Sequence, residues 1–225
     1  MRPLFVHLLV AFIHEMGHIS ASIFLKVRVE KLTVLPFGFF SEIPELEHIH
    51  VLKELCIVAA GPLMYFTNQA VLLLLFQTNT ISLHLMQQGM EANNIVLLFN
   101  LLPIYPLDGY RISSIIMSFF LTYKVSKKIN VILSLFSLLI MIYLGFTSAN
   151  IIVYCYLIFM QVYFIMRFRE MYLSFIVSRL RTSIYKKAIF NRRKDFIRPY
   201  DNVFMKNGHL LSEKEYALEL LSKKH

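Results

Sequence analysis

Long apolar stretches alternate with short polar segments along this chain, and the pattern predicts helices that cross a membrane. About five of the stretches approach the roughly 20 residues that a bilayer requires of a spanning helix. They cover approximately residues 4–25, 55–76, 95–120, 129–148 and 150–167. The fold class that follows is an all-α polytopic membrane protein with about five transmembrane helices.

The segment at 26–54, between the first two apolar stretches, does not fit a spanning helix. Residues 32–40 are apolar and rich in strand formers, but Pro36 and Gly38 interrupt them and they are too few to cross a bilayer. We expect a short strand or hairpin that lies in or against the membrane and is shielded by protein. The polar residues at 43–53 predict an interfacial helix.

The third apolar stretch is interrupted at residues 100–111, which read NLLPIYPLDGYR. Two prolines and a glycine in this segment predict that the helix breaks or restarts there. Broken backbone at membrane depth is tolerated where it is buried in protein or lines a polar cavity. Asp108 lies at the break, and with Glu15 it is one of two acidic residues within the predicted spans.

The first apolar stretch contains the motif HEMGH at 14–18. At helical spacing His14 and His18 lie on one face, where they can bind one metal ion together. Glu15 lies one residue round from that face, where its carboxylate can act on a water molecule at the metal. An ionised carboxylate at mid-bilayer costs roughly 2.5–3.5 kcal/mol on insertion scales, so chemistry is the favoured reason for its presence. A catalytic zinc ion needs three protein ligands, and Asp108 is the acidic candidate at membrane depth for the third.

Composition supports a membrane protein, because 57% of the residues are hydrophobic and 16% are charged. Cys56 and Cys155 lie in apolar stretches and imply no disulfide framework. The formal net charge is +9, and residues 167–225, with 14 Lys/Arg against 6 Asp/Glu, carry +8 of it. We therefore divide the chain into a membrane-embedded metalloprotease domain at 1–167 and a basic tail at 168–225.

The basic residues also predict how the chain is oriented in the membrane. Segments 26–54 and 121–128 and residues 167–225 contain four, three and 14 Lys/Arg, and five spans place all of them on one side. Basic loops stay in the cytoplasm, so we expect a cytoplasmic C-terminus. The tail should dock on anionic lipid, and we expect no nucleic-acid binding because no recognition fold is evident. The proposed docking residues are Lys186, Lys187, Arg192, Arg193, Lys194 and Arg198.

Each of these features has an alternative explanation. An HExxH pattern arises by chance in soluble proteins, although a second carboxylate on a broken membrane span makes chance a poor account here. Asp108 can form a structural ion pair with Arg111, three residues further along a helix. Asn100 can hydrogen-bond to a neighbouring helix. For the whole protein, an intramembrane metal transporter and a catalytically inactive membrane scaffold stay open beside a peptidase.

The motifs together resemble the site-2 protease family of intramembrane zinc metalloproteases. HEMGH at 14–18, LPFG at 35–38, AAGP at 59–62 and NLLPIYPLDG at 100–109 are similar to its sporulation branch. That branch is the stage IV sporulation protein FB group of endospore-forming bacteria, and the resemblance covers roughly residues 4–170.

The resemblance implies one zinc ion per chain, held by His14, His18 and Asp108, with Glu15 as general base. Asn100 would assist in the site by holding substrate backbone. The implied substrate is the membrane-associated proform of the sporulation sigma factor K, cut on the mother-cell side. The implied partners are inhibitory membrane proteins, the FA companion protein and bypass-of-forespore protein A, in the mother-cell membrane around the forespore.

The strand-forming segment at 32–40 predicts a further contact with substrate. A helical substrate hides its carbonyl groups in hydrogen bonds, so it must be unwound before attack. An edge strand that includes Val34, Pro36 and Phe37 would hold the extended chain by strand addition.

Three features depart from the family pattern. Tyr110 stands where members have a second glycine after the Asp-Gly pair. Members normally carry a span ahead of the HExxH helix, whereas 13 residues precede His14, so we expect a shortened or misassigned start. The segment 168–225 is too short and too basic for the nucleotide-sensing CBS domain of this branch, so we expect no nucleotide control.

Overall fold

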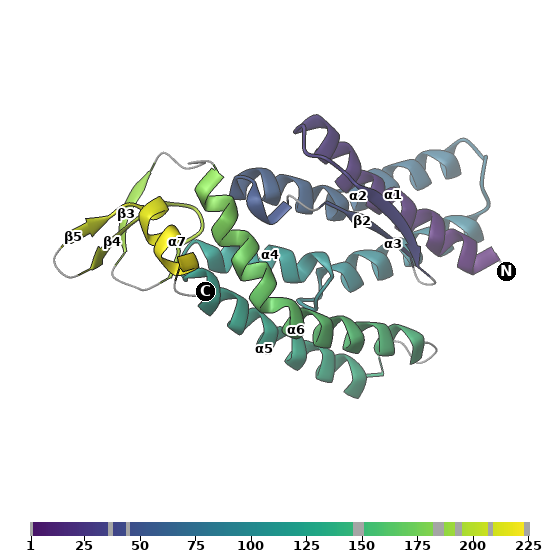
Figure 1. Ribbon diagram of the computed structural model, residues 1–225. Coiled ribbons are helices and arrows are strands. Elements are labelled where there is room, and N and C mark those ends of the chain that lie inside the picture. The colour runs from purple at the N-terminus through teal and green to yellow at the C-terminus, as the bar shows by residue number, and fades with distance from the viewer. Residues whose placement is uncertain are drawn as a thin grey trace. The chain divides into compact units, whose positions relative to one another are not determined.

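The computed structural model describes residues 2–35, 38–43, 46–145, 151–181, 187–191, 195–206 and 209–222. These ranges contain seven α-helices, a short 3₁₀ helix at Leu46–His48, and five strands (Figure 1). The α-helices are α1 (Arg2–Phe24), α2 (Val51–Gln77), α3 (Leu83–Leu101), α4 (Asp108–Ser118), α5 (Tyr123–Tyr143), α6 (Ile151–Arg181) and α7 (Glu213–Ser222). The strands are β1 (Lys31–Leu35), β2 (Gly38–Glu42), β3 (Ala188–Asn191), β4 (Asp201–Lys206) and β5 (His209–Leu211).

Four helices of the described ranges, α1, α2, α5 and α6, are long and apolar enough to cross a membrane. The prediction of an all-α polytopic membrane protein with a short strand segment is therefore confirmed. The chain forms two compact units. The first unit comprises Met1–Leu46, Leu52–Leu102 and Leu107–Ile112, and the second comprises Glu47–Val51, Pro103–Pro106 and Ser113–His225.

The predicted third span is two helices, α3 and α4, separated by residues 102–107. The break was predicted from the prolines and is confirmed, but the start of the span near residue 95 is wrong because α3 begins at Leu83. Polar side chains lower the hydropathy of this helix, yet Asn93 among them is buried and hydrogen-bonded inside the first unit. Asn93 is 2% exposed. It accepts a hydrogen bond from Asn68 Nδ2 at 3.2 Å and donates one to the Tyr65 carbonyl at 3.0 Å.

Strands β1 and β2 form an antiparallel hairpin in the first unit, as the strand formers at 32–40 predicted. The register pairs Leu35 with Gly38 and Leu32 with Ser41. Strand β2 packs against α1, where the Phe12 and Phe39 rings meet edge to face with centroids 5.3 Å apart. The hairpin therefore lies beside the helix that carries the HExxH motif. Among the described residues of the polar segment at 43–53, Leu46–His48 form a 3₁₀ turn, and α2 begins at Val51.

The second unit joins α5 and α6 to a small sheet and α7. The sheet has the order β3-β4-β5, with β3 parallel to β4 and β4 antiparallel to β5. Helix α6 continues to Arg181, so the boundary predicted at 167 falls inside a helix. The predicted turn at 148–150 lies outside the described residues.

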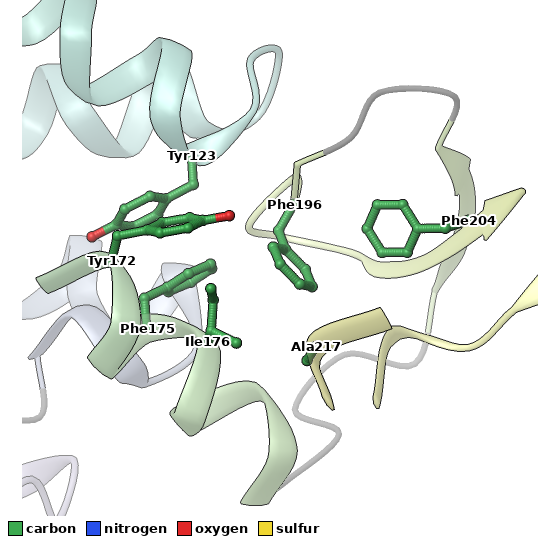
Figure 2. Packing of buried hydrophobic residues seen from close by; sticks show 7 residues of the cluster. All are labelled: Tyr123, Tyr172, Phe175, Ile176, Phe196, Phe204 and Ala217. Carbon is green, nitrogen blue, oxygen red and sulfur yellow. The ribbon is translucent and has the colours of Figure 1, made fainter. Parts of the chain in front are cut away.

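The segment predicted as a basic tail contributes to a hydrophobic core (Figure 2). The rings of Tyr123 and Phe175 stack with centroids 4.1 Å apart, and the Phe196 ring meets Phe204 edge to face at 5.4 Å. The buried members of the cluster are Tyr123, Tyr172, Phe175, Ile176, Phe196, Phe204 and Ala217. Aromatic burial of this kind stabilises a packed unit, so much of the tail is folded against the ends of α5 and α6.

Candidate metal centre

His14 and His18 lie one turn apart on α1, and each is 6% exposed. The α-helix places them on one face, with their Nε2 atoms 3.3 Å apart. Asp108 is the first residue of α4, and its Oδ2 lies 3.0 Å from His14 Nε2 and 3.1 Å from His18 Nε2. Three side chains from two distant parts of the sequence therefore form a compact, buried triangle of ligand atoms.

The triangle fits a zinc ion. Zinc binds imidazole nitrogen and carboxylate oxygen at about 2.0–2.2 Å, and tetrahedral geometry then separates neighbouring ligand atoms by about 3.4 Å. The three observed separations of 3.0–3.3 Å are close to that value. Two histidines and one carboxylate are also a ligand set that zinc uses in catalytic sites, where the fourth position stays open.

The backbone of α2 orients one of the imidazoles. His18 Nδ1 lies 2.9 Å from the Ile57 carbonyl oxygen, so Nδ1 donates and Nε2 keeps its lone pair for a metal. Gly61, one turn further along α2, leaves room for the ring, because a Cβ there would overlap the His18 imidazole. Gly17 similarly lets the two helices come close, since a Cβ on it would lie 2.6 Å from the Ala60 carbonyl oxygen.

Asp108 reaches the histidines because α4 restarts directly against the end of α3. Gly109 permits that approach, because a Cβ there would overlap the Leu101 carbonyl. The carboxylate pairs with the two imidazoles, and no ion pair joins it to Arg111 in the described part of the chain. Tyr110, the departure from the family pattern, is 2% exposed and packs inside the protein.

Polar side chains of α5 and α6 bind the backbone of Tyr105, which lies in the broken segment before Asp108. The Tyr105 N–H donates to Ser134 Oγ at 3.0 Å, and its carbonyl accepts from Gln161 Nε2 at 3.2 Å. Gln161 also donates to Ser134 Oγ at 2.5 Å. Both backbone groups of Tyr105 are therefore satisfied by α5 and α6, as irregular backbone away from water requires. Sequence reasoning missed this pair, although Gln161 was a polar residue in an apolar span.

Glu15 lies next to the triangle and is held by the hairpin. Its Oε1 accepts hydrogen bonds from the Ser41 N–H at 2.6 Å and from Ser41 Oγ at 2.7 Å. Its Oε2 lies 4.0 Å from His18 Nε2. Glu15 and Ser41 are 8% and 5% exposed. One carboxylate oxygen is thus fixed to β2, while the other faces the histidines without joining the ligand triangle.

The described residues predicted to bind substrate, Val34 and Asn100, make no hydrogen bond to the ligand triangle. Val34 is 69% exposed on β1, where it is not packed into the core. The Asn100 amide donates to the Val96 carbonyl of its own helix at 2.9 Å, and no described hydrogen bond joins it to the ligand triangle. Pro36 and Phe37 lie outside the described residues.

Comparison with known proteins finds relatives but no matching family model. The chain is 31% identical to Stage IV sporulation protein FB of Bacillus subtilis over 135 residues, which cover 60% of this chain and 47% of that protein. It is 35% identical to a zinc metalloprotease of Methanocaldococcus jannaschii over 153 residues, which cover 66% of this chain and 44% of that protein. The chain therefore spans less than half the length of both curated relatives.

A solved structure extends the similarity to three dimensions. The site-2 protease from Methanocaldococcus jannaschii shares 32% sequence identity with this chain and superposes with a TM-score of 0.50. The match covers 71% of this chain and 73% of that chain.

Proposed function

The chain belongs to the site-2 protease family, and from this premise we propose that it is a zinc endopeptidase that cleaves a membrane-associated protein. The observation that carries the proposal is the buried triangle of His14, His18 and Asp108 in a predominantly apolar chain. The name of the archaeal relative, a zinc metalloprotease, supports zinc as the metal. Two imidazoles and a carboxylate at membrane depth are energetically costly. Such residues are rare in membrane spans, and those that occur usually have a function.

The residues at the site have separate roles in this proposal. His14, His18 and Asp108 would hold zinc, which supplies Lewis acidity that polarises a carbonyl and lowers the pKa of water towards 7. Glu15, whose Oε2 faces the histidines, takes a proton from the attacking water and later delivers it to the leaving amine. Burial of the site excludes bulk water, which strengthens each of these electrostatic interactions.

The hairpin supplies a binding surface for an unwound substrate in this proposal. Paired strands alternate between hydrogen-bonded and non-hydrogen-bonded pairs. Since two residues separate Leu35 from Gly38, that closing pair is expected to be hydrogen-bonded, and the Val34 N–H then faces away from β2. An extended substrate can add to β1 at that edge, with Val34, Pro36 and Phe37 in the contact and Asn100 assisting.

The substrate that this proposal favours is a membrane-associated proform of a sigma factor of the sporulation K type. The similarity to Stage IV sporulation protein FB supports it. Inhibitory membrane proteins of a sporulation complex are the corresponding partners. The protein is a membrane protein of the cell membrane, and we place its C-terminus in the cytoplasm, because five spans would put the basic segments on one side.

Co-expression with candidate membrane-tethered sigma-factor precursors tests the proposal. Wild type should release a shortened product that Glu15→Gln does not release, while Glu91→Gln, an exposed acid on α3, should behave as wild type. Failure of wild type to cleave any precursor, with zinc bound, would remove the peptidase assignment. A metal transporter would instead show metal uptake into vesicles that Glu15→Gln retains.

A further inference from the structure

The contact between Glu15 and Ser41 is unusually specific for a catalytic carboxylate and a strand. Two donors of one residue, the backbone N–H and the side-chain hydroxyl, converge on the same oxygen, Oε1, at 2.6 and 2.7 Å. Both residues are buried, so water does not compete for these bonds. Hydrogen bonds to an ionised carboxylate are about twice as strong as neutral ones.

The pairing of the hairpin explains why the Ser41 N–H is available. Ser41 pairs with Leu32, three positions along the ladder from the closing pair of Leu35 and Gly38. The alternation of an antiparallel ladder makes this a non-hydrogen-bonded pair, so the Ser41 N–H faces away from β1. It therefore lies on the outer edge of β2, the strand that packs against α1, and donates there to Glu15.

The contact has a consequence for proton transfer. A free glutamate side chain has three rotatable bonds, and a proton acceptor must lie within hydrogen-bond reach of the water that it deprotonates. Fixing Oε1 to β2 restricts the direction of Oε2, which lies 4.0 Å from His18 Nε2 and on the side of the ligand triangle. A displacement of about 1 Å in such a group can cost about 100-fold in rate.

We propose that Ser41 is a positioning residue for Glu15: it holds Oε1 so that Oε2 alone serves the attacking water. The inference rests on the proposed peptidase function and deepens it, because it assigns β2 a part in the chemistry in addition to substrate binding. It also implies that substrate strands add to β1, since the outward donor of β2 at Ser41 is already used by the enzyme.

The role is tested by comparing Ser41→Ala with Ser41→Thr. Alanine removes the hydroxyl donor, whereas threonine retains it and suits a strand. Ser41→Ala should lower kcat about 10- to 100-fold with KM within about twofold of wild type, and Ser41→Thr should restore most of the loss. Zinc content should be equal in all three proteins, because Ser41 does not contact the ligand atoms.

Ser118→Ala is the matched control. Ser118 is 3% exposed, and its hydroxyl donates at 2.6 Å to the Ile115 carbonyl of its own helix. This variant should keep wild-type kcat and KM. An unchanged kcat in Ser41→Ala would overturn the inference, and so would a rise in KM alone, which would mean that Ser41 binds substrate.

A measurement that needs no turnover separates the inference from the proposed function. Infrared difference spectra of each protein against the same protein with Glu15→Gln isolate the Glu15 carboxylate band. That band should shift in Ser41→Ala and stay in place in Ser118→Ala. A band that does not move shows that the contact is absent and overturns the inference, whether or not a substrate is cleaved. If the band shifts while wild type loaded with zinc cleaves nothing, the contact stands and the peptidase function fails.

Discussion

At the scale of single residues, His18 and Glu15 each have one atom committed to orientation and another left for chemistry. His18 donates from Nδ1 to the Ile57 carbonyl and presents Nε2. Glu15 accepts from Ser41 at Oε1 and presents Oε2. Asp108 presents Oδ2 to both histidines. This division predicts different consequences for removing a ligand and for removing a base.

The first prediction compares Glu15→Gln with Asp108→Ala. Glu15→Gln should abolish cleavage but retain most of the zinc, because Glu15 lies outside the ligand triangle. Asp108→Ala should lose zinc as well as activity, since two ligands bind a metal weakly. Elemental analysis of the purified variants decides between them. Equal zinc loss in both, or full zinc occupancy in Asp108→Ala, would contradict the assigned roles.

At the scale of elements, the hairpin and the broken segment between α3 and α4 position what the helices carry. Strand β2 fixes Glu15, and β1 carries the exposed residue Val34. The segment 102–107 holds Asp108 at the start of α4, and its own backbone is held by side chains of α5 and α6. Each element can be perturbed without touching a ligand atom.

The second prediction concerns the edge of β1. Proline at Val34 should remove an N–H that faces away from β2, and so should slow cleavage without releasing zinc or opening the hairpin. Proline at Thr33, which faces Phe40 in an expected hydrogen-bonded pair, should disrupt the hairpin itself. Initial cleavage rates and zinc content distinguish the two variants. Unchanged cleavage by a folded Val34→Pro protein would exclude substrate addition at this edge.

The third prediction concerns the support of the broken segment. Gln161→Leu is nearly isosteric but removes the hydrogen bond from Gln161 to the Tyr105 carbonyl, so the segment before Asp108 should loosen. We expect zinc affinity to fall about 10- to 100-fold, which is typical when a residue that orients a metal ligand is mutated.

Competition with a metal chelator measures that affinity. Gln69→Leu is the matched control, because Gln69 is also a part-buried polar residue of a spanning helix but bonds to Tyr65 at 3.0 Å. If both variants keep wild-type zinc affinity, the hydrogen bond from Gln161 to Tyr105 does not affect zinc binding by Asp108.

At the scale of the whole molecule, the C-terminal region is partly structural and only partly available for docking. Arg198, one of the six predicted docking residues, is 4% exposed, and its Nη2 donates to the Glu47 carbonyl at 2.7 Å. The prediction that Arg198 faces lipid is therefore wrong, because its guanidinium is buried inside the second unit and donates a hydrogen bond there. Lys187 is exposed, and the other four residues lie outside the described ranges.

The fourth prediction separates docking from folding. Replacing Lys187 and the four docking residues outside the described ranges by glutamine should weaken binding to vesicles that contain anionic lipid, by about 1 kcal/mol per residue near the surface. High salt should mimic the loss, and single-turnover cleavage should stay close to wild type.

Arg198→Gln should instead lower the melting temperature, because it removes a buried hydrogen bond to Glu47. Vesicle binding and thermal unfolding are the two measurements. Abolished single-turnover cleavage in the five-residue variant would show that this region shapes the active site.

Local periodicity alone determined much of this protein. Apolar length predicts the spans at α1, α2, α5 and α6, because hydropathy is a property of consecutive residues. Helical spacing places His14 and His18 on one face, and the prolines before Asp108 predict the break. Strand formers predict the hairpin. These features depend on residues close in sequence, so no tertiary information is needed to find them.

Only the tertiary structure decided which distant groups meet. The bonds from Ser41 to Glu15 and from Gln161 to Tyr105 join residues 26 and 56 positions apart, and no periodicity encodes such pairs. The start of α3 at Leu83 was missed for the same reason, because a polar side chain such as Asn93 is satisfied by partners on α2. The folded C-terminal core depends on aromatic contacts between α5, α6 and the sheet. The number of basic residues, on which the prediction of a tail was based, contains no information about these contacts. Hydropathy records what a residue would cost alone in lipid, whereas the fold decides whether a partner offsets that cost.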